Sequence, residues 1–197
     1  LSILYGNEEY GIGFKNVFKE SFEILGGTVV SEESFDRGTA DLRTQLTKLR
    51  KGKPTALFII SNSPDSSVAA LKQIKQLGLK FAVFGSEGLK GPEVASTKAA
   101  QNLTITSVSA GTSEFIAKYR NEHGLEIQPF APQAYDAFTA LAMAVKNGAK
   151  TGSEIKTQLN QMQFSGASGK IEFDSNGDVE GYYDVYRLVN GTFVLTD

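Results

Sequence analysis

Short, mostly apolar runs alternate with segments of helical periodicity through the first half of the chain. Apolar residues on both faces of a run are typical of parallel strands that are buried between two layers of helices. The runs recur every roughly 20 to 30 residues, which is the spacing that βαβ units require. They lie at residues 1–5, 28–30, 55–60, 81–84 and 103–106. This alternation predicts an α/β fold with a Rossmann-like parallel sheet flanked by helices.

The alternation stops near Ser107. Beyond it we expect two helices in succession, around residues 115–119 and 134–145, with no strand between them. A capping box at Thr151–Glu154 predicts a third helix. The last part of the chain, from about residue 170, combines strand-like runs with two turn signals, and we expect a terminal β-meander there. The change of pattern near Ser107 predicts a lobe boundary or a crossover.

The ionisable residues exclude several classes of function. Twenty Lys and Arg residues stand against twenty-two Asp and Glu residues, so the chain lacks the basic surplus typical of nucleic-acid binding. Cysteine is absent and the single histidine is His123, which excludes Cys-based metal sites and sites with two histidines. No run approaches the roughly 18 to 20 apolar residues that cross a bilayer, so we expect no direct membrane insertion.

Catalysis is not expected from these residues. The chain has no Gly-x-Ser-x-Gly nucleophile elbow, and His123 is expected to lie at a solvated helix end. A glycine pair at Gly11 and Gly13 lacks the third glycine of a dinucleotide fingerprint, and the acidic segment 174–178 is better explained as a hairpin turn than as a calcium loop. We therefore expect no enzyme, no cofactor and no metal; an enzyme that depends on His123 is the alternative.

The candidate site residues follow predicted strands. Doubly wound sheets bind ligands outside the carboxyl ends of their strands. Tyr10, after the first strand, could offer a ring face and a hydroxyl there, or could pack under the following helix. Glu87 stands in a glycine-flanked loop after a buried strand, so its carboxylate would lie at the same edge unless it is simply solvated. Asn62 and Ser63 precede Pro64, where Ser63 could cap a helix and also contact a ligand.

Six segments carry a resemblance to a known family. In this order and spacing, which cover nearly the whole chain, they resemble the type I periplasmic binding proteins of the leucine/isoleucine/valine group, the solute receptors of branched-chain amino acid ABC importers. The segments are residues 7–13, 26–30, 35–36, 41–46, 134–137 and 171–178.

The resemblance implies two Rossmann-like lobes that close on a solute about a hinge. Residues 1–109 resemble the second lobe. Residues 110–197 resemble the hinge crossover, the returning helices of the first lobe and the terminal strands, so we expect the N-terminal segment of the first lobe to be missing. The family also implies a periplasmic or extracellular location.

The resemblance further implies roles for individual residues. Tyr10 matches the aromatic residue that covers the solute, Glu87 matches the acid that pairs with its α-ammonium, and Phe130 matches an aromatic wall near the hinge. Ser63 departs from the pattern, because amino-acid-binding members often have Tyr there. The implied function is binding of an amino acid, a related carboxylate or a similar small solute between the lobes, with an ABC permease in the membrane as partner of the closed form. A ligand-sensing domain of a signalling receptor is the alternative.

Overall fold

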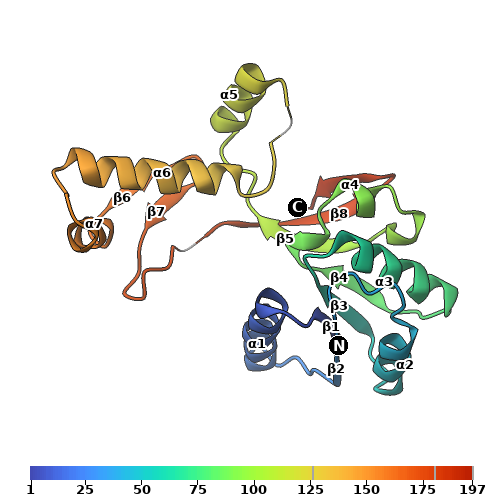
Figure 1. The fold of residues 1–197 in the computed structure, drawn as a ribbon. Coiled ribbons are helices and arrows are strands. Elements are labelled where there is room, and N and C mark those ends of the chain that lie inside the picture. Colours follow the sequence, from blue (N-terminus) through green and yellow to red (C-terminus); the bar gives the residue numbers. More distant parts are fainter. Residues whose placement is uncertain (126, 180, 197) are drawn as a thin grey trace. The chain divides into compact units, whose positions relative to one another are not determined.

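The computed structural model describes residues 1–125, 127–179 and 181–196. The chain divides into two compact units (Figure 1). The first unit comprises Leu1–Ser107 with Val185–Asp197, and the second comprises Val108–Asp184. The main segment of the first unit therefore ends at the residue where the sequence pattern changes.

The first unit contains a seven-stranded sheet of order β2-β1-β3-β4-β5-β8-β9. Neighbouring strands from β2 to β5 run parallel. This confirms the predicted α/β fold with a parallel sheet. The strands are β1 (Ser2–Gly6), β2 (Ser31–Phe35), β3 (Ala56–Ile60), β4 (Ala82–Gly85), β5 (Thr104–Val108), β8 (Tyr183–Val189) and β9 (Thr192–Leu195).

Helices cover both faces of the central strands, because successive side chains of a strand point to opposite faces. Leu57 and Ile59 of β3 belong to the larger hydrophobic cluster, together with residues of α2 and α3, while Phe58 and Ile60 pack with residues of α1. Figure 1 shows α1 on one side of these strands and α2 and α3 on the other. The helical segments are α1 (Glu9–Ile24), α2 (Arg43–Lys51), α3 (Pro64–Gln76), η1 (Glu87–Leu89), α4 (Pro92–Ala95) and η2 (Lys98–Ala100).

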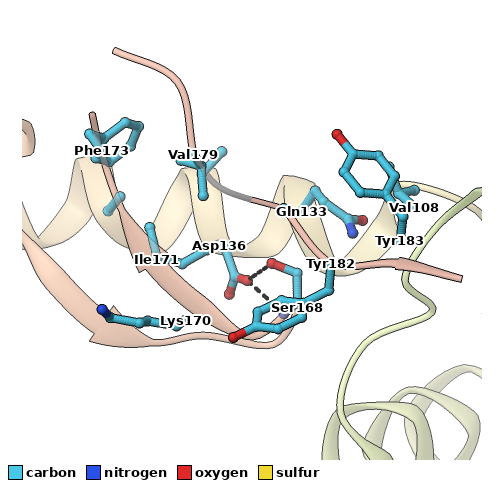
Figure 2. A pocket seen from close by; sticks show the side chains of 13 residues that line it. Val108, Gln133, Asp136, Ser168, Lys170, Ile171, Phe173, Val179, Tyr182 and Tyr183 are labelled. Carbon is cyan, nitrogen blue, oxygen red and sulfur yellow. Dashed lines mark hydrogen bonds between the residues drawn. The ribbon is translucent and has the colours of Figure 1, made fainter. Parts of the chain in front are cut away.

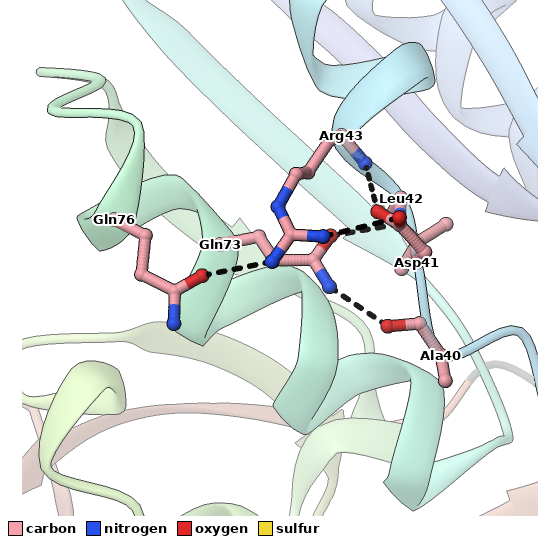
Figure 3. Close-up of polar contacts among 6 residues, drawn as sticks. All are labelled: Ala40, Asp41, Leu42, Arg43, Gln73 and Gln76. Atoms are coloured by element: carbon pink, nitrogen blue, oxygen red, sulfur yellow. Dashed lines mark hydrogen bonds and ion pairs between the residues drawn. The ribbon is translucent and has the colours of Figure 1, made fainter.

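A buried glutamine joins the start of α2 to α3 (Figure 3). The Gln73 side chain accepts a hydrogen bond from the Leu42 backbone N–H at 2.7 Å and donates one to the Ala40 carbonyl at 2.7 Å. Both polar ends of this buried amide are thereby satisfied. Because the partners lie more than thirty residues apart along the chain, no local sequence pattern indicated this contact.

The second unit contains three helices and a short antiparallel strand pair among its described residues. The predicted capping box is confirmed: Thr151 Oγ1 accepts from the Glu154 N–H at 3.3 Å, and the Glu154 carboxylate accepts from the Thr151 N–H at 3.0 Å. The elements are α5 (Ser113–His123), α6 (Ala131–Lys146), α7 (Gly152–Leu159), β6 (Gln163–Ser165) and β7 (Lys170–Glu172).

The terminal strands pair differently from a single meander. β7 pairs with β6, whereas β8 and β9 form a hairpin that extends the sheet of the first unit. Leu188 donates its N–H to the Leu103 carbonyl at 2.8 Å, which ties β8 to the start of β5. The turn at Asn190 and Gly191 has the positive φ values, 50° and 81°, that a two-residue hairpin turn favours. Alternation and turn residues predict strands, but they do not select the edge on which those strands pair.

The second strand also begins later than its apolar residues suggest. The apolar run at residues 28–30 predicted it, but β2 occupies Ser31–Phe35 and contains two glutamates. β2 lies at the edge of the sheet, where one side of the strand is open to polar residues. Lys15 of α1 lies 3.1 Å from the Glu32 carboxylate, and Lys19 lies 2.5 Å from it. Burial opposes ionisation of Glu32, but these two lysines hold its pKa below the ordinary value.

Candidate functional site

Two hydrogen bonds join the segments that directly follow β1, β3 and β4. The Tyr10 hydroxyl donates to Glu87 Oε1 at 2.7 Å, across 77 residues of sequence. Asn62 Nδ2 donates to Glu8 Oε2 at 2.9 Å. Because β1, β3 and β4 are adjacent parallel strands, their carboxyl ends meet at one edge of the sheet. The structure therefore brings the predicted residues Tyr10, Asn62 and Glu87 to the same edge.

Gly11 lets α1 begin directly against the end of β1. A Cβ atom at Gly11 would lie only 2.1 Å from the Gly6 carbonyl oxygen, which is part of the backbone and cannot move aside. This close approach fixes the first turn of α1, and with it Tyr10, over the sheet edge. The interpretation of this glycine as a packing requirement, and not as part of a nucleotide site, agrees with this geometry.

Tyr10 combines a packed ring with a polar tip. Its ring meets Phe14 edge to face at 5.8 Å between centroids, and Phe14 in turn contacts Phe58 of β3. The two interpretations of Tyr10, as a packing residue and as a site residue, are therefore compatible. Burial raises the pKa of the Tyr10 phenol; a hydrogen bond with Ser86 opposes this rise, and the hydrogen bond to Glu87 and its charge add to it. The phenol consequently remains a hydrogen-bond donor at neutral pH.

We expect the Tyr10 phenol to ionise at a higher pH than an ordinary tyrosine, whose pKa is 10.0. Because folding raises this pKa, the protonated phenol contributes to stability below pH 10.0, and the contribution falls as the pH rises further. In an alkaline titration followed by phenolate absorbance, one component should ionise at higher pH than an ordinary tyrosine. We refer to it as the late component, and it should be missing in Tyr10→Phe. Glu87→Gln should move that component to lower pH, because it removes the neighbouring negative charge. A late component that persists in Tyr10→Phe would contradict this assignment.

Ser63 occupies the predicted N-cap position of α3, directly before Pro64, but its side chain makes no capping hydrogen bond to the helix. Its hydroxyl donates to Ser66 Oγ at 3.1 Å and accepts from the Gly38 N–H at 3.4 Å. Only 6% of the residue is exposed. The hydroxyl is thus engaged within a buried serine cluster, and contact between Ser63 and a ligand stays a prediction.

Phe130 belongs to the second unit, where it immediately precedes α6. It adopts a left-handed conformation with φ of 68°, and 49% of the residue is exposed. An exposed aromatic side chain at a helix start suits a wall that contacts a ligand. Its role as such a wall stays a prediction.

The second unit has its own hollow of about 260 Å³ (Figure 2). Asp136 lies at its side, but its carboxylate already accepts hydrogen bonds from Ala167 N at 2.6 Å, Ser168 N at 2.7 Å and Ser168 Oγ at 2.5 Å. Ile171, Phe173 and other apolar side chains form much of the remaining wall. The Asp136 carboxylate therefore holds the chain between β6 and β7, and we do not assign it to a solute.

Sequence reasoning missed two residues at the sheet edge, Glu8 and Ser86. Glu8 binds Asn62 through one oxygen, and its other oxygen is buried with no hydrogen-bond partner among the described residues. Ser86 is completely buried and accepts from the Ser61 N–H at 3.4 Å, and its side chain acts to lower the pKa of Tyr10. Glu8 lies two residues before Tyr10, and Ser86 lies one residue before Glu87. The available sequence signal for both was therefore their position in short polar segments around predicted site residues.

Two carboxylates, those of Glu8 and Glu87, lie at this edge. No ion pair among the described residues includes Glu8 or Glu87. Carboxylates accept strong hydrogen bonds from ammonium and guanidinium groups. The arrangement therefore suits a ligand that brings a cationic donor, with the Tyr10 ring and hydroxyl beside it.

Other kinds of site are not indicated in the part of the chain that the structure describes. Within residues 1–125, 127–179 and 181–196, no group of three or more His, Cys, Asp or Glu side chains is arranged to hold a metal ion. No helix in the same residues has the length and apolar character needed to cross a membrane.

Sequence comparison relates the chain to binding proteins. The family profile described as "Periplasmic binding protein" matches residues 2–192. The leucine-, isoleucine-, valine-, threonine- and alanine-binding protein of Pseudomonas aeruginosa is 24% identical over 200 residues, which are 95% of this chain and 52% of that protein. The chain thus spans about half the length of this relative.

Structural comparison leads to the same fold. A leucine-binding protein from Thermotoga maritima superposes with a TM-score of 0.83 at 24% identity, over 100% of this chain and 59% of that chain. A branched-chain amino acid transporter substrate-binding protein from Streptococcus pneumoniae, solved with isoleucine, gives a TM-score of 0.76 at 28% identity, over 99% of this chain and 60% of that chain.

Proposed function

Because the chain belongs to the periplasmic binding protein family, we propose that it is part of the extracytoplasmic solute receptor of an ABC importer. Its solute is an amino acid or a related small molecule with an amino group. The relatives in Pseudomonas and Streptococcus are named for binding or transporting branched-chain amino acids, which supports this solute class. The closed receptor would deliver the solute to a membrane permease.

The observation that carries this proposal is the Glu87 carboxylate at the sheet edge. It accepts the Tyr10 hydroxyl at 2.7 Å and forms no ion pair among the described residues. Closing a site over an unpaired carboxylate costs free energy, because the charge loses its water. An ammonium group of the solute would offset that cost by a charge-assisted hydrogen bond. A solute with only a carboxylate would instead be repelled.

We assign residues 1–109 to the second lobe of the receptor, together with the β8–β9 hairpin that extends their sheet, and the residues between them to the hinge crossover and the returning first-lobe helices. In this assignment Tyr10 and Glu87 meet the solute from the second lobe, Asn62 and Ser63 line the same edge, and Phe130 forms a wall near the hinge. The solute binds the closed arrangement more tightly and shifts the population toward it.

Thermal unfolding of the intact receptor tests the proposal, since a ligand that binds the folded state raises Tm. The three probes are L-leucine, N-acetyl-L-leucine and 4-methylpentanoate, which share the side chain but differ at the amino group. We expect L-leucine, or another free amino acid of a wider panel, to raise Tm, and its N-acetyl and deaminated forms to leave Tm unchanged. Equal shifts with an amino acid and its deaminated form would overturn the assignment of Glu87 to an ammonium group.

A further inference from the structure

The turn that carries Glu87 lies directly on the backbone of the neighbouring loop. Gly88 is the middle residue of η1, and a Cβ atom there would lie 2.0 Å from the Ser61 carbonyl oxygen and 3.2 Å from the Asn62 Cα. Ordinary contacts of a Cβ atom begin at 3.4 Å. Both neighbouring atoms belong to backbone, so neither can rotate away as the end of a side chain could. Only a residue without a side chain allows this approach.

The residues on either side of Gly88 hold the turn in place. Leu89 is completely buried in the larger hydrophobic cluster. Ser86 donates its N–H to the Ile59 carbonyl at 3.0 Å and accepts the Ser61 N–H at 3.4 Å through its hydroxyl. The turn is therefore clamped between a buried leucine and the end of β3. A shift of the turn would have to disturb one of these contacts.

Tyr10 cannot follow such a shift, because it is held by a different element. Its helix starts against β1 at Gly11, where the backbone approach is equally close, and its ring packs on Phe14. The 2.7 Å hydrogen bond between Tyr10 and Glu87 thus depends on two independently placed elements, α1 and η1. The distance between the Tyr10 and Glu87 side chains is therefore set by where α1 and η1 rest on the sheet.

We propose that Gly88 is a positioning residue of the candidate site, whose missing side chain lets η1 rest on the Ser61 backbone and so places the Glu87 carboxylate against the Tyr10 hydroxyl. A methyl group at residue 88 must move η1 outward by more than an ångström, from 2.0 Å to ordinary contact. The Tyr10–Glu87 hydrogen bond is then lost although both side chains are still present. Only the solute measurement below rests on the proposed function.

The first test needs no solute. In protein with 13C-labelled tyrosine rings, Tyr10→Phe identifies the Tyr10 Cζ resonance. Glu87→Gln should shift this resonance in the parent chain, because an amide oxygen replaces the carboxylate as acceptor. In the Gly88→Ala background the same substitution should produce less than a third of that shift, and a shift of the parent's size would overturn the proposal. A purely structural role for Gly88 predicts a lower Tm with the full shift retained.

A matched control and a second variant complete this test. Gly91→Ala lies in the same loop, but its Cβ would meet only the end of the Glu93 side chain, at 3.1 Å, so the coupling of Tyr10 to Glu87 should be preserved. If Gly88→Ala does not fold, Leu89→Val loosens the opposite support of η1, and it should also reduce the shift. Full coupling in folded Leu89→Val would contradict the clamped turn.

The second test measures binding of a free amino acid, with L-leucine as the probe, to the intact receptor by calorimetry. Gly88→Ala should weaken binding about ten-fold, and Glu87→Gln should weaken it by less than two-fold more in that background, because coupled residues are not additive. If Glu87→Gln weakens binding by the same factor in the Gly88→Ala background as in the parent receptor, the positioning role is overturned. If the parent receptor does not bind leucine, the proposed function fails for this solute. The resonance test needs no solute and still decides the role of Gly88.

Discussion

Asp136→Ala should destabilise the second unit by roughly 3 kcal/mol or more, since each buried polar group left unpaired costs about 1–3 kcal/mol. Asp136 is 3% exposed as a residue, and its carboxylate accepts hydrogen bonds from the backbone N–H groups of Ala167 and Ser168. The chain wraps closely around it: a Cβ at Gly166 would lie 2.5 Å from the carboxyl group. Alanine leaves these donors without a partner and opens a cavity beside them.

Amide hydrogen exchange measures this effect locally, which is appropriate because a chain with two units need not unfold in one step. Protection of the Ala167 and Ser168 amides should be lost in Asp136→Ala, while protection of β1 and β3 in the first unit is kept. The control is Glu122→Ala, which removes an exposed acid from α5 of the same unit. Unchanged protection at Ala167 would show that Asp136 does not hold this turn.

Glu87→Gln should weaken binding of an amine-bearing solute to the intact receptor by at least ~1.5 kcal/mol, a little more than ten-fold in Kd. Glutamine keeps the size of the side chain and can still accept the Tyr10 hydroxyl, so packing is retained. What disappears is the negative charge that faces the ammonium group. In a closed cleft that loss is large, because little water remains to screen the interaction.

Calorimetry with L-leucine, or with whichever amino acid raises Tm most, provides the measurement. Glu93→Gln in α4 is the matched control: it removes one exposed acid close in sequence, and it should leave the affinity unchanged. Equal affinities of Glu87→Gln and the parent protein would remove Glu87 from the binding site. A loss of the same size in Glu93→Gln would indicate a general effect of charge and not a contact.

Most secondary-structure elements follow from local patterns. The buried run at residues 55–60 became β3, the capping box opened α7, and Asn190-Gly191 formed the hairpin turn. These features depend on side-chain periodicity, backbone preference and bonds within a few residues. β2 differs because an edge strand tolerates polar residues when lysines of a neighbouring helix offset their charge.

The candidate site was only partly predictable. The rule that ligands bind at the carboxyl ends of parallel strands indicates Tyr10, Asn62 and Glu87 from the sequence alone. Glu8 and Ser86 carried no separate signal, since a polar residue near a helix start is common on any surface. Their importance comes from partners far along the chain: Glu8 bonds Asn62, 54 residues away.

The amino-acid order alone indicated the strand and helix types, because these depend on neighbours within a few residues. It also indicated the parallel sheet and its ligand-facing edge, because strands that recur every roughly 20 to 30 residues leave room for the helical crossovers of βαβ units. Tertiary structure decided which donors and acceptors pair at that edge. It also decided that β8 and β9 extend the first sheet, that Gln73 joins α2 to α3, and that a side chain at Gly88 would collide with Ser61. Such contacts join residues tens of positions apart, and their distances are set by how whole elements pack.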